Sequence, residues 1–201
     1  MNKLKINKLG LNSCLISCLS LGFSSMPNAQ ECYDNPNLLT SSSKEFIAHN
    51  DGTVTHLQTR IMWKQCLAGI NAGAGGACSE GELELLNWQQ ALQYVQELNA
   101  SGGFAGYTDW RLPNAKELTS VIEYGCSKPA INLQMFPNMA GTRVWSSTPS
   151  ISQNTALALK TWAADYGDPN AGSGSDSGVV TFANASRESQ KYAVHLIRGA
   201  Q

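Results

Sequence analysis

Apolar residues recur at helical spacing in two segments of the chain. The first segment, residues 87–103, carries one apolar stripe opposite a face of Gln, Glu and Asn. Asn87 is a suitable N-cap, and Gly102 and Gly103 are typical of a helix end. The stripe consists of Trp88, Ala91, Leu92, Val95 and Leu98. We therefore predict a helix that packs on a core by one side.

The second helical pattern covers residues 114–125. Asn114 can accept hydrogen bonds from the first free backbone N–H groups, and Glu117 can reach back in a capping box. Pro113 holds the entering chain extended, and Gly125 is a natural C-terminal stop. The buried stripe would consist of Leu118, Val121 and Ile122. This pattern predicts a second amphipathic helix.

Strand-like patterns occupy most of the remaining sequence. Two short runs flank a turn at Asn50-Asp51-Gly52, and a further strand is expected at residues 60–66. The later predicted strands cover residues 142–149, 157–165, 178–183 and 191–199. Two helices among about seven short strands indicate a compact α+β domain with antiparallel pairing and long loops. We place this single domain at residues 46–201, after an irregular tail at 30–45.

Residues 1–29 differ in character from the rest of the chain. A lysine-rich start, an apolar run at 9–23 and a small residue at Ala29 are typical of a cleaved secretory signal. A lipoprotein signal is the alternative, because "LISC" would place Cys18 at the mature N-terminus. The mature chain then has no transmembrane segment. We predict an exported protein in the periplasm, at the cell surface or outside the cell.

Removal of this signal changes the charge of the chain. The signal carries three lysines and no acidic residue, so 14 basic and 15 acidic residues become 11 and 15, a net charge of −4. Polyanion binding depends on clustered Lys and Arg, so we expect no nucleic-acid partner. The basic residues of the C-terminal part are scattered in sequence: Lys128, Arg143, Lys160, Arg187, Lys191 and Arg198.

Four cysteines remain in the mature chain, and an even count in an exported protein suggests two disulfides. They permit three pairings. A bond between Cys66 and Cys78 would close the Gly-rich loop between them, and Cys32 would then tie the tail to Cys126. A zinc site is the alternative, but no C-x-x-C spacing occurs and the histidines are scattered.

An ordered set of motifs resembles one known family. The motifs are "MWKQC", "NWQQALQYVQELN", "GGFAGYTDWRLPNAKEL", "PAIN…FPN", "VWSST" and "YAVHLIRGAQ". Together they are similar to the Legionella collagen-like protein C-terminal domain family, over roughly residues 46–201. The resemblance implies a fold related to C-type lectin-like and formylglycine-generating-enzyme-like domains. It also implies binding rather than a known reaction, because the best understood member is an adhesin for sulfated glycosaminoglycans.

The segment "DWRLPNAKEL" holds the most concentrated set of charges. Asp109 and Arg111 fit an acid–base or anion-binding pair, but they also fit a structural clamp on the helix entrance. We favour the structural role, with Arg111 bridging Asp109, Glu117 or backbone carbonyls, and with Asn114 and Glu117 as caps.

We predict that the protein is not an enzyme. An oxidase of the formylglycine-generating type needs a cysteine pair in its C-terminal half, and no cysteine follows Cys126. Ser146 and Ser147 lack the context of a serine hydrolase, and His195 alternates with apolar residues as in an ordinary strand. A paired-carboxylate glycosidase stays open, because distances in space are not visible in a sequence.

Aromatic and amide groups near the C-terminal strands favour a ligand site instead. The candidate binding residues are Trp145, Trp162, Tyr166, Asp168, Asn170, Asp176 and Tyr192. The tryptophans also fit the core, and the loop residues also fit plain turns. Calcium is a possible ligand of this loop through Asp165, Asp168, Asn170 and Asp176, although the spacing fits no EF-hand. We otherwise expect no metal or cofactor.

These observations predict an exported, non-catalytic binding or adhesion module. Its partner would be a glycan or a surface polymer, bound through the C-terminal loop face. The alternative is a structural or assembly module whose loops contact another surface protein.

Overall fold

The structure is a computed structural model that describes residues 30–199, except 36, 38, 74–75, 138, 140, 142, 151–159, 168–178 and 185–189. The predicted signal peptide, with Cys18, lies outside these residues. Within the described part, two α-helices and short antiparallel strands confirm the α+β class. No helix of this part is long and apolar enough to cross a membrane.

A four-stranded antiparallel sheet forms one half of the domain, in the order β11-β4-β3-β2. Its strands are β2 (Phe46–Ala48), β3 (Thr53–His56), β4 (Ile61–Lys64) and β11 (Ile197–Gly199). The predicted Asn50-Asp51-Gly52 turn joins β2 and β3. Asp51 Oδ1 accepts hydrogen bonds from the N–H and the hydroxyl of Thr53, and Gly52 takes the positive φ of 79° that the turn requires.

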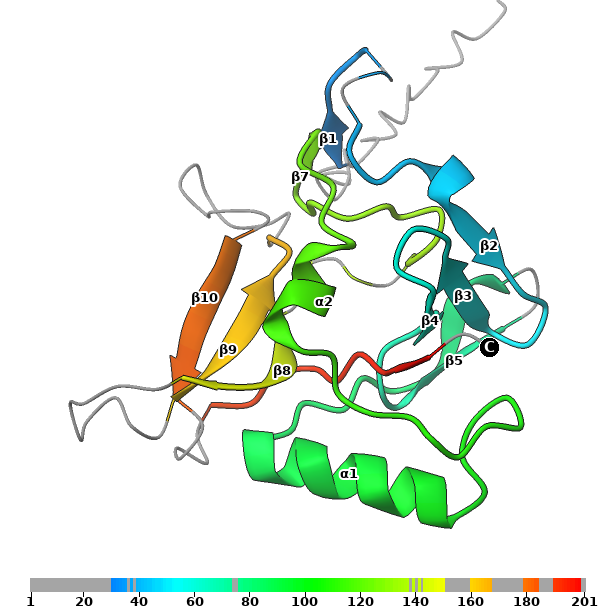
Figure 1. Cartoon of the computed structure of the whole chain (residues 1–201), viewed down its shortest axis with the longest axis vertical. Helices are drawn as coiled ribbons and strands as arrows, with labels where there is room; N and C mark the ends of the chain where they lie inside the picture. Colours follow the sequence, from blue (N-terminus) through cyan, green and yellow to red (C-terminus); the bar gives the residue numbers. More distant parts are fainter. Residues whose placement is uncertain are drawn as a thin grey trace, which may run out of the picture.

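A second antiparallel sheet, in the order β10-β9-β8, forms the other half. It contains β8 (Arg143–Ser150), β9 (Lys160–Asp165) and β10 (Val179–Asn184). In Figure 1 this sheet and the β2–β4 strands lie on opposite sides of helix α2 (Ala115–Thr119). Helix α2 contacts β8, β9 and β10. At its start, the backbone N–H of Ala115 donates to the Thr148 hydroxyl.

The C-terminal segment joins the two halves. Ala193 exchanges backbone hydrogen bonds with β8, Val194 accepts one from Ala68, and Leu196 accepts one from Lys64. The regular strand is therefore only Ile197–Gly199, shorter than the predicted 191–199, because the chain pairs with several different segments before it reaches β4. Figure 1 shows this segment in red, crossing from the β8 side to the β4 side.

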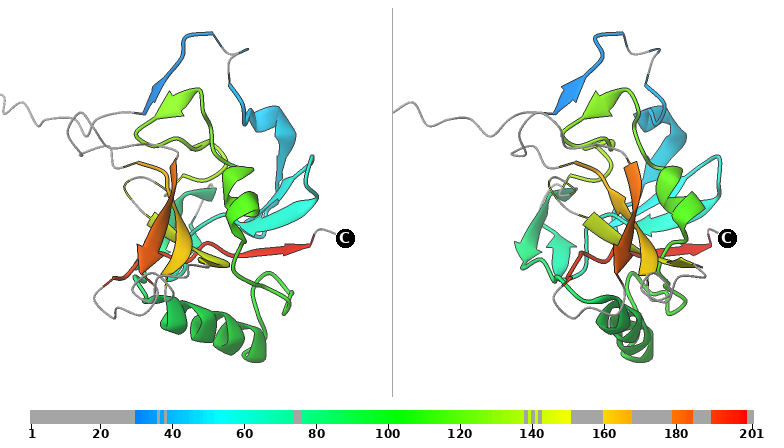
Figure 2. Two further views of the ribbon diagram at one scale, coloured as in Figure 1. Left: turned by 60° about the vertical axis from the view of Figure 1, so that its left-hand side comes forward. Right: turned by 90° about the vertical axis from the view of Figure 1, so that its left-hand side faces the viewer.

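Helix α1 (Trp88–Ala100) confirms the first helical prediction. Asn87 and Gln90 form a capping box at its start, and Ala91 and Val95 are buried. Trp88 also reaches the second sheet, since its indole N–H donates to the Ser146 carbonyl at 2.8 Å. Both views in Figure 2 place α1 along one edge of the body, as the amphipathic pattern predicts.

The second helix is shorter than predicted. Helix α2 ends at Thr119, so Gly125 is not its stop. Past the helix, Ile122 forms an isolated bridge with Ile131, and the buried Glu123 carboxylate accepts hydrogen bonds from backbone N–H groups of the tail and of Gly125. These tertiary contacts stabilise a chain of turns where the apolar spacing indicated further helical turns.

The N-terminal tail is more regular than predicted. It contains β1 (Glu31–Cys32), paired with β7 (Cys126–Ser127), and a 3-10 helix at Ser43–Glu45. A second ribbon pairs β5 (Ile70–Ala72) with β6 (Cys78–Gly81). The disulfide Cys32–Cys126 joins β1 to β7, and Cys66–Cys78 joins the chain before β5 to β6, so the predicted pairing is confirmed.

Candidate functional site

The helix entrance at residues 109–117 is fixed by charge pairing and by capping. The Asn114 side chain accepts from the Glu117 N–H at 2.9 Å, and Glu117 Oε2 accepts from the Asn114 N–H at 2.7 Å. Arg111 donates to both oxygens of Glu117, at 2.8 and 2.6 Å. Burial alone would raise the pKa of the Glu117 carboxyl, but Arg111 and the Asn114 N–H outweigh it and hold the pKa below its usual value.

Of the partners expected for Arg111, the structure shows Glu117 and a backbone carbonyl, that of Leu112, whereas Asp109 pairs with Arg198. Arg198 Nε lies 2.6 Å from Asp109 Oδ1, and the guanidinium lies 3.8 Å from the centre of the Tyr107 ring. The antiparallel bridge between Arg111 and Ile197 places Arg198 beside Asp109, while Arg111 faces the first turn of α2. The hydrogen bond from Arg198 lowers the pKa of Asp109. Both carboxylates of this segment are thus held in ion pairs.

Two residues of the predicted ligand face belong to the core. Trp145 and Tyr166 each have 0% exposed surface, which corrects the expectation that they form part of an open platform. The Trp145 indole N–H donates to the Leu86 carbonyl at 2.6 Å. Trp145 lies on β8 and Tyr166 directly follows β9, and each belongs to an apolar cluster that includes residues of the C-terminal segment, where apolar area is removed from water.

The other residues of that predicted face are only partly described. Tyr192 is half-buried, with its ring 4.5 Å from that of Trp145, and Trp162 is half-buried on β9. Arg143 lies over the Tyr192 ring, with its guanidinium carbon 5.8 Å from the ring centre. Asp168, Asn170 and Asp176 lie outside the described residues.

The calcium prediction rests mostly on residues that are not described. Asp165 is described, and its two oxygens accept hydrogen bonds from Arg143 Nε at 2.8 Å and from the Gly167 N–H at 2.9 Å. Among the described residues, no three His, Cys, Asp or Glu side chains gather as a metal site would require. The Asp165 carboxylate therefore acts as a partner of Arg143 in this structure.

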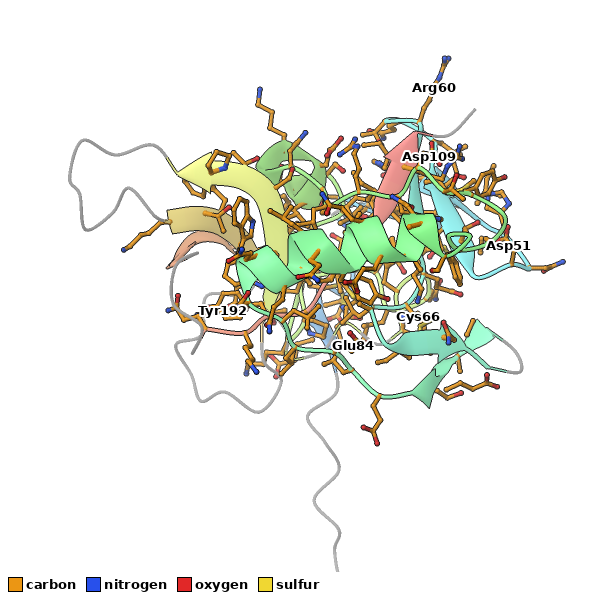
Figure 3. The ribbon with its side chains drawn as sticks, turned by 90° about the horizontal axis from the view of Figure 1, so that it is seen from below. Asp51, Arg60, Cys66, Glu84, Asp109 and Tyr192 are labelled. Carbon is orange, nitrogen blue, oxygen red and sulfur yellow. A yellow bond between two sulfur atoms is a disulfide. The ribbon has the colours of Figure 1, made fainter. Side chains whose placement is uncertain are left out.

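A polar cleft of about 920 Å³ lies between the β2–β3 turn and the β5–β6 ribbon. Its polar side chains are His49, Asn50, Asp51, Gln65, Asn71 and Gln134. Its apolar side chains are Ala48, Ala72, Ala77, Phe104 and Pro137. In Figure 3, Asp51 lies beyond one end of α1, whereas Tyr192 lies beside the other end. The cleft is therefore a separate region from the predicted C-terminal face.

Phe104 provides the aromatic surface of the cleft. A Cβ added at Gly52 would lie 3.2 Å from Phe104 Cζ, so the ring packs closely on the backbone of the β2–β3 turn. The Phe104 ring also contacts Trp110 edge-on, with the ring centres 5.9 Å apart. These contacts hold the ring in place, and Phe104 lines the cleft together with its amide groups.

Lys64 fixes the loop that leads to the cleft wall. Its buried ammonium donates to the carbonyls of Cys66, Leu67 and Ile70, and it lies 4.9 Å from the centre of the Phe104 ring. Burial lowers the pKa of Lys64 to about 8, so the group stays mostly charged at neutral pH. Together with the Cys66–Cys78 disulfide, these contacts tie the segment before β5 to β4 and to β6.

His195 lies deep in the core but outside the sheet, because β11 begins only at Ile197, so the interpretation as a sheet residue is wrong. Its Nε2 is 2.9 Å from the Lys64 carbonyl, and its ring contacts those of Trp63 and Phe136. Burial lowers the pKa of His195 to about 3, so the imidazole is neutral at physiological pH. His195 therefore supports the backbone of Lys64, whose ammonium group holds the chain beside the cleft.

Sequence reasoning missed the cleft. Gln65 and Lys64 stand inside the motif "MWKQC", but nothing local distinguishes a buried lysine from one in an exposed strand. Asn71 and Phe104 stand in two Gly-rich segments that the sequence indicates only as loops. Tertiary contacts bring these segments to the β2–β3 turn.

The chain matches a known protein family. The Lcl C-terminal domain family matches residues 52–198, which include the helix entrance and most of the residues that line the cleft, but not Ala48–Asp51. No curated protein matches the chain.

Proposed function

Because the chain belongs to the Lcl C-terminal domain family, we propose that it is an exported, non-catalytic module that binds a glycan or another surface polymer. The two disulfides indicate an exported protein. The cleft between the β2–β3 turn and the β5–β6 ribbon is the binding site of this proposal. Periplasm, cell surface and external medium are all compatible with it.

The observation that supports this proposal is the chemistry of the cleft. Asn50, Asn71, Gln65 and Gln134 each carry an amide, which both donates and accepts hydrogen bonds. Sugar hydroxyls need such paired donors and acceptors, and the C–H face of a sugar ring packs on an aromatic ring such as Phe104. The charge pairs of the helix entrance and the buried His195 are occupied in structural contacts.

The contacts that hold the cleft walls also support a binding role. The Lys64 ammonium and the Cys66–Cys78 disulfide hold one wall, and the Asp51–Thr53 hydrogen bonds hold the other. A site that is already ordered loses little conformational entropy when a ligand binds. The cleft therefore fits recognition of a chain-like ligand without a large rearrangement.

A glycan array with the mature protein tests the proposal. We expect a binding signal that falls about threefold to tenfold in Asn71→Ala, which removes one exposed amide from the cleft wall. Gln89→Ala, an equivalent loss on the exposed face of α1, should leave the signal unchanged. Absence of any glycan signal from protein with intact disulfides and cooperative thermal unfolding would contradict the proposal.

An assembly module is the second candidate, and one surface favours it. Tyr33 and Tyr124 lie beside the β1–β7 ribbon, are 63% and 61% exposed, and both line a groove of about 280 Å³. Exposed tyrosines are common at protein contacts. A stable complex in pull-downs that is lost in Tyr33→Ser/Tyr124→Ser, together with no glycan signal, would favour this alternative.

A further inference from the structure

We propose that the cleft selects uncharged glycans and excludes sulfated or otherwise anionic chains. This inference rests on the proposed function, because it names the ligand class of the same cleft. It differs from the sulfated ligand that the family resemblance implies. Four observations support it: the lining residues, the position of Lys64, the Phe104 surface and the pairing of three arginines.

The described residues that line the cleft include no Lys and no Arg. Their hydrogen-bonding groups are four amides, the imidazole of His49 and the carboxylate of Asp51. The Asp51 carboxylate, which already accepts from Thr53, would repel a sulfate or carboxylate group. A sulfated chain requires clustered cations for its affinity, and this cleft does not supply them.

The Lys64 ammonium lies close to the cleft but is buried behind its surface. The Lys64 ammonium is near the Phe104 ring, yet Lys64 is 4% exposed and does not line the cleft. An ammonium has three N–H donors, and Lys64 has three carbonyl acceptors, from Cys66, Leu67 and Ile70. No donor of this lysine is therefore left for an anionic ligand.

Three of the four arginines in the described residues are held in ion pairs, whereas Arg60 is exposed in the turn between β3 and β4. Arg111, Arg143 and Arg198 each pair with a carboxylate, at 2.6, 2.8 and 2.6 Å. Paired guanidinium groups contribute little net positive potential to a surface. The mature net charge of −4, from 11 basic and 15 acidic residues, acts in the same direction.

Uncharged sugars can pair with the hydrogen-bonding groups that line the cleft. Each amide can donate to one hydroxyl and accept from another, and the Phe104 ring presents an apolar face for the C–H side of a pyranose. Asp51 accepts from a hydroxyl without charge repulsion. The recognition is therefore directional and does not depend on counterion release.

The test compares two probes on the wild-type protein: a panel of neutral hexose and N-acetylhexosamine oligomers, and heparin. We expect neutral oligomers to bind, with a Kd that changes less than about twofold between about 50 and 500 mM NaCl. Heparin should bind at least about tenfold more weakly at the lower salt concentration. Tighter binding of heparin, with a steep salt dependence, overturns the inference and leaves the proposed function intact. Binding of neither probe overturns the proposed function itself.

A charge-insertion pair locates the effect. Asn71→Lys places a cation on the exposed cleft wall, and Gln89→Lys places one on the exposed face of α1. We expect Asn71→Lys to weaken the neutral oligomer at least about fivefold and to strengthen heparin binding, whereas Gln89→Lys changes neither. Equal behaviour of the two variants, both folded by circular dichroism, overturns the assignment of this selectivity to the cleft.

Discussion

Acid should destabilise this protein chiefly through His195. The residue is fully buried, its Nε2 faces the Lys64 carbonyl, and its Nδ1 has no hydrogen-bond partner. The neutral imidazole fits this place, since Nε2–H donates to the carbonyl. The charged imidazolium would add a second buried N–H without an acceptor, close to the Lys64 ammonium.

The size of this acid destabilisation follows from the lowered pKa of His195. Burial lowers the pKa of His195 from 6.5 to about 3 in the folded protein. Below about pH 6.5 the unfolded chain binds a proton that the folded protein does not, so the free energy of unfolding falls by about 1.4 kcal/mol per pH unit. The contribution is complete above pH 6.5 and is lost progressively down to about pH 3. Between about pH 6.5 and 4.5 the expected loss is about 2–3 kcal/mol.

Urea unfolding monitored by tryptophan fluorescence measures this loss, because the Trp63 ring lies 4.6 Å from that of His195. His195→Gln keeps an N–H that can donate to the Lys64 carbonyl but cannot titrate, so its free energy of unfolding should fall less steeply over the same range. His49→Gln, at a half-buried histidine, is the matched control and should keep the wild-type slope. Identical pH slopes for wild type and His195→Gln would refute the reasoning. Burial also lowers the pKa of His56, although Glu45 opposes it, so part of the slope remains in both variants.

Three further changes test the structural contacts. Arg111→Ala should lower the free energy of unfolding by about 1 kcal/mol, since the ion pair with Glu117 is half-exposed. Any loss of ligand binding should follow unfolding, so a stably folded variant that does not bind would contradict the structural role. Glu123→Gln should lower the free energy of unfolding by about 2–4 kcal/mol, because an amide NH₂ would face backbone N–H donors in a buried site. Urea unfolding measures this loss, and an unchanged midpoint would argue against the hydrogen bonds of the Glu123 carboxylate. Replacing Cys32 and Cys126 by Ser should cost about 4–5 kcal/mol by the chain-entropy estimate for a loop of 94 residues, measured by calorimetry; a loss below about 1 kcal/mol would show that the tail contributes little.

Local sequence determined the features that involve neighbours in the chain. The caps of α1 and α2 join residues three positions apart, so Asn87 and Asn114 identify the helix starts without further knowledge. The Gly-rich loop between Cys66 and Cys78 made that disulfide the natural choice of pairing. The ordered motifs also identified the family.

Tertiary structure decided the features that depend on distant partners. Arg198 pairs with Asp109, which lies 89 positions away in the sequence, and Arg111 pairs with Glu117 instead. Burial of Trp145 and Tyr166 removed them from the predicted ligand face, because a strand pattern does not say which face of a small sheet the rest of the chain covers.

The cleft depended on tertiary structure most of all. It forms where the β2–β3 turn, the β5–β6 ribbon and the Phe104 loop meet, and none of these segments has a local pattern that indicates a site. Lys64 illustrates the reason. Its charge is visible in the sequence, but only the three carbonyls around it determine that the charge holds a wall and is closed to a ligand. Capping and periodicity are local properties of the chain, whereas burial, ion-pair choice and cavity shape arise only when distant segments pack together.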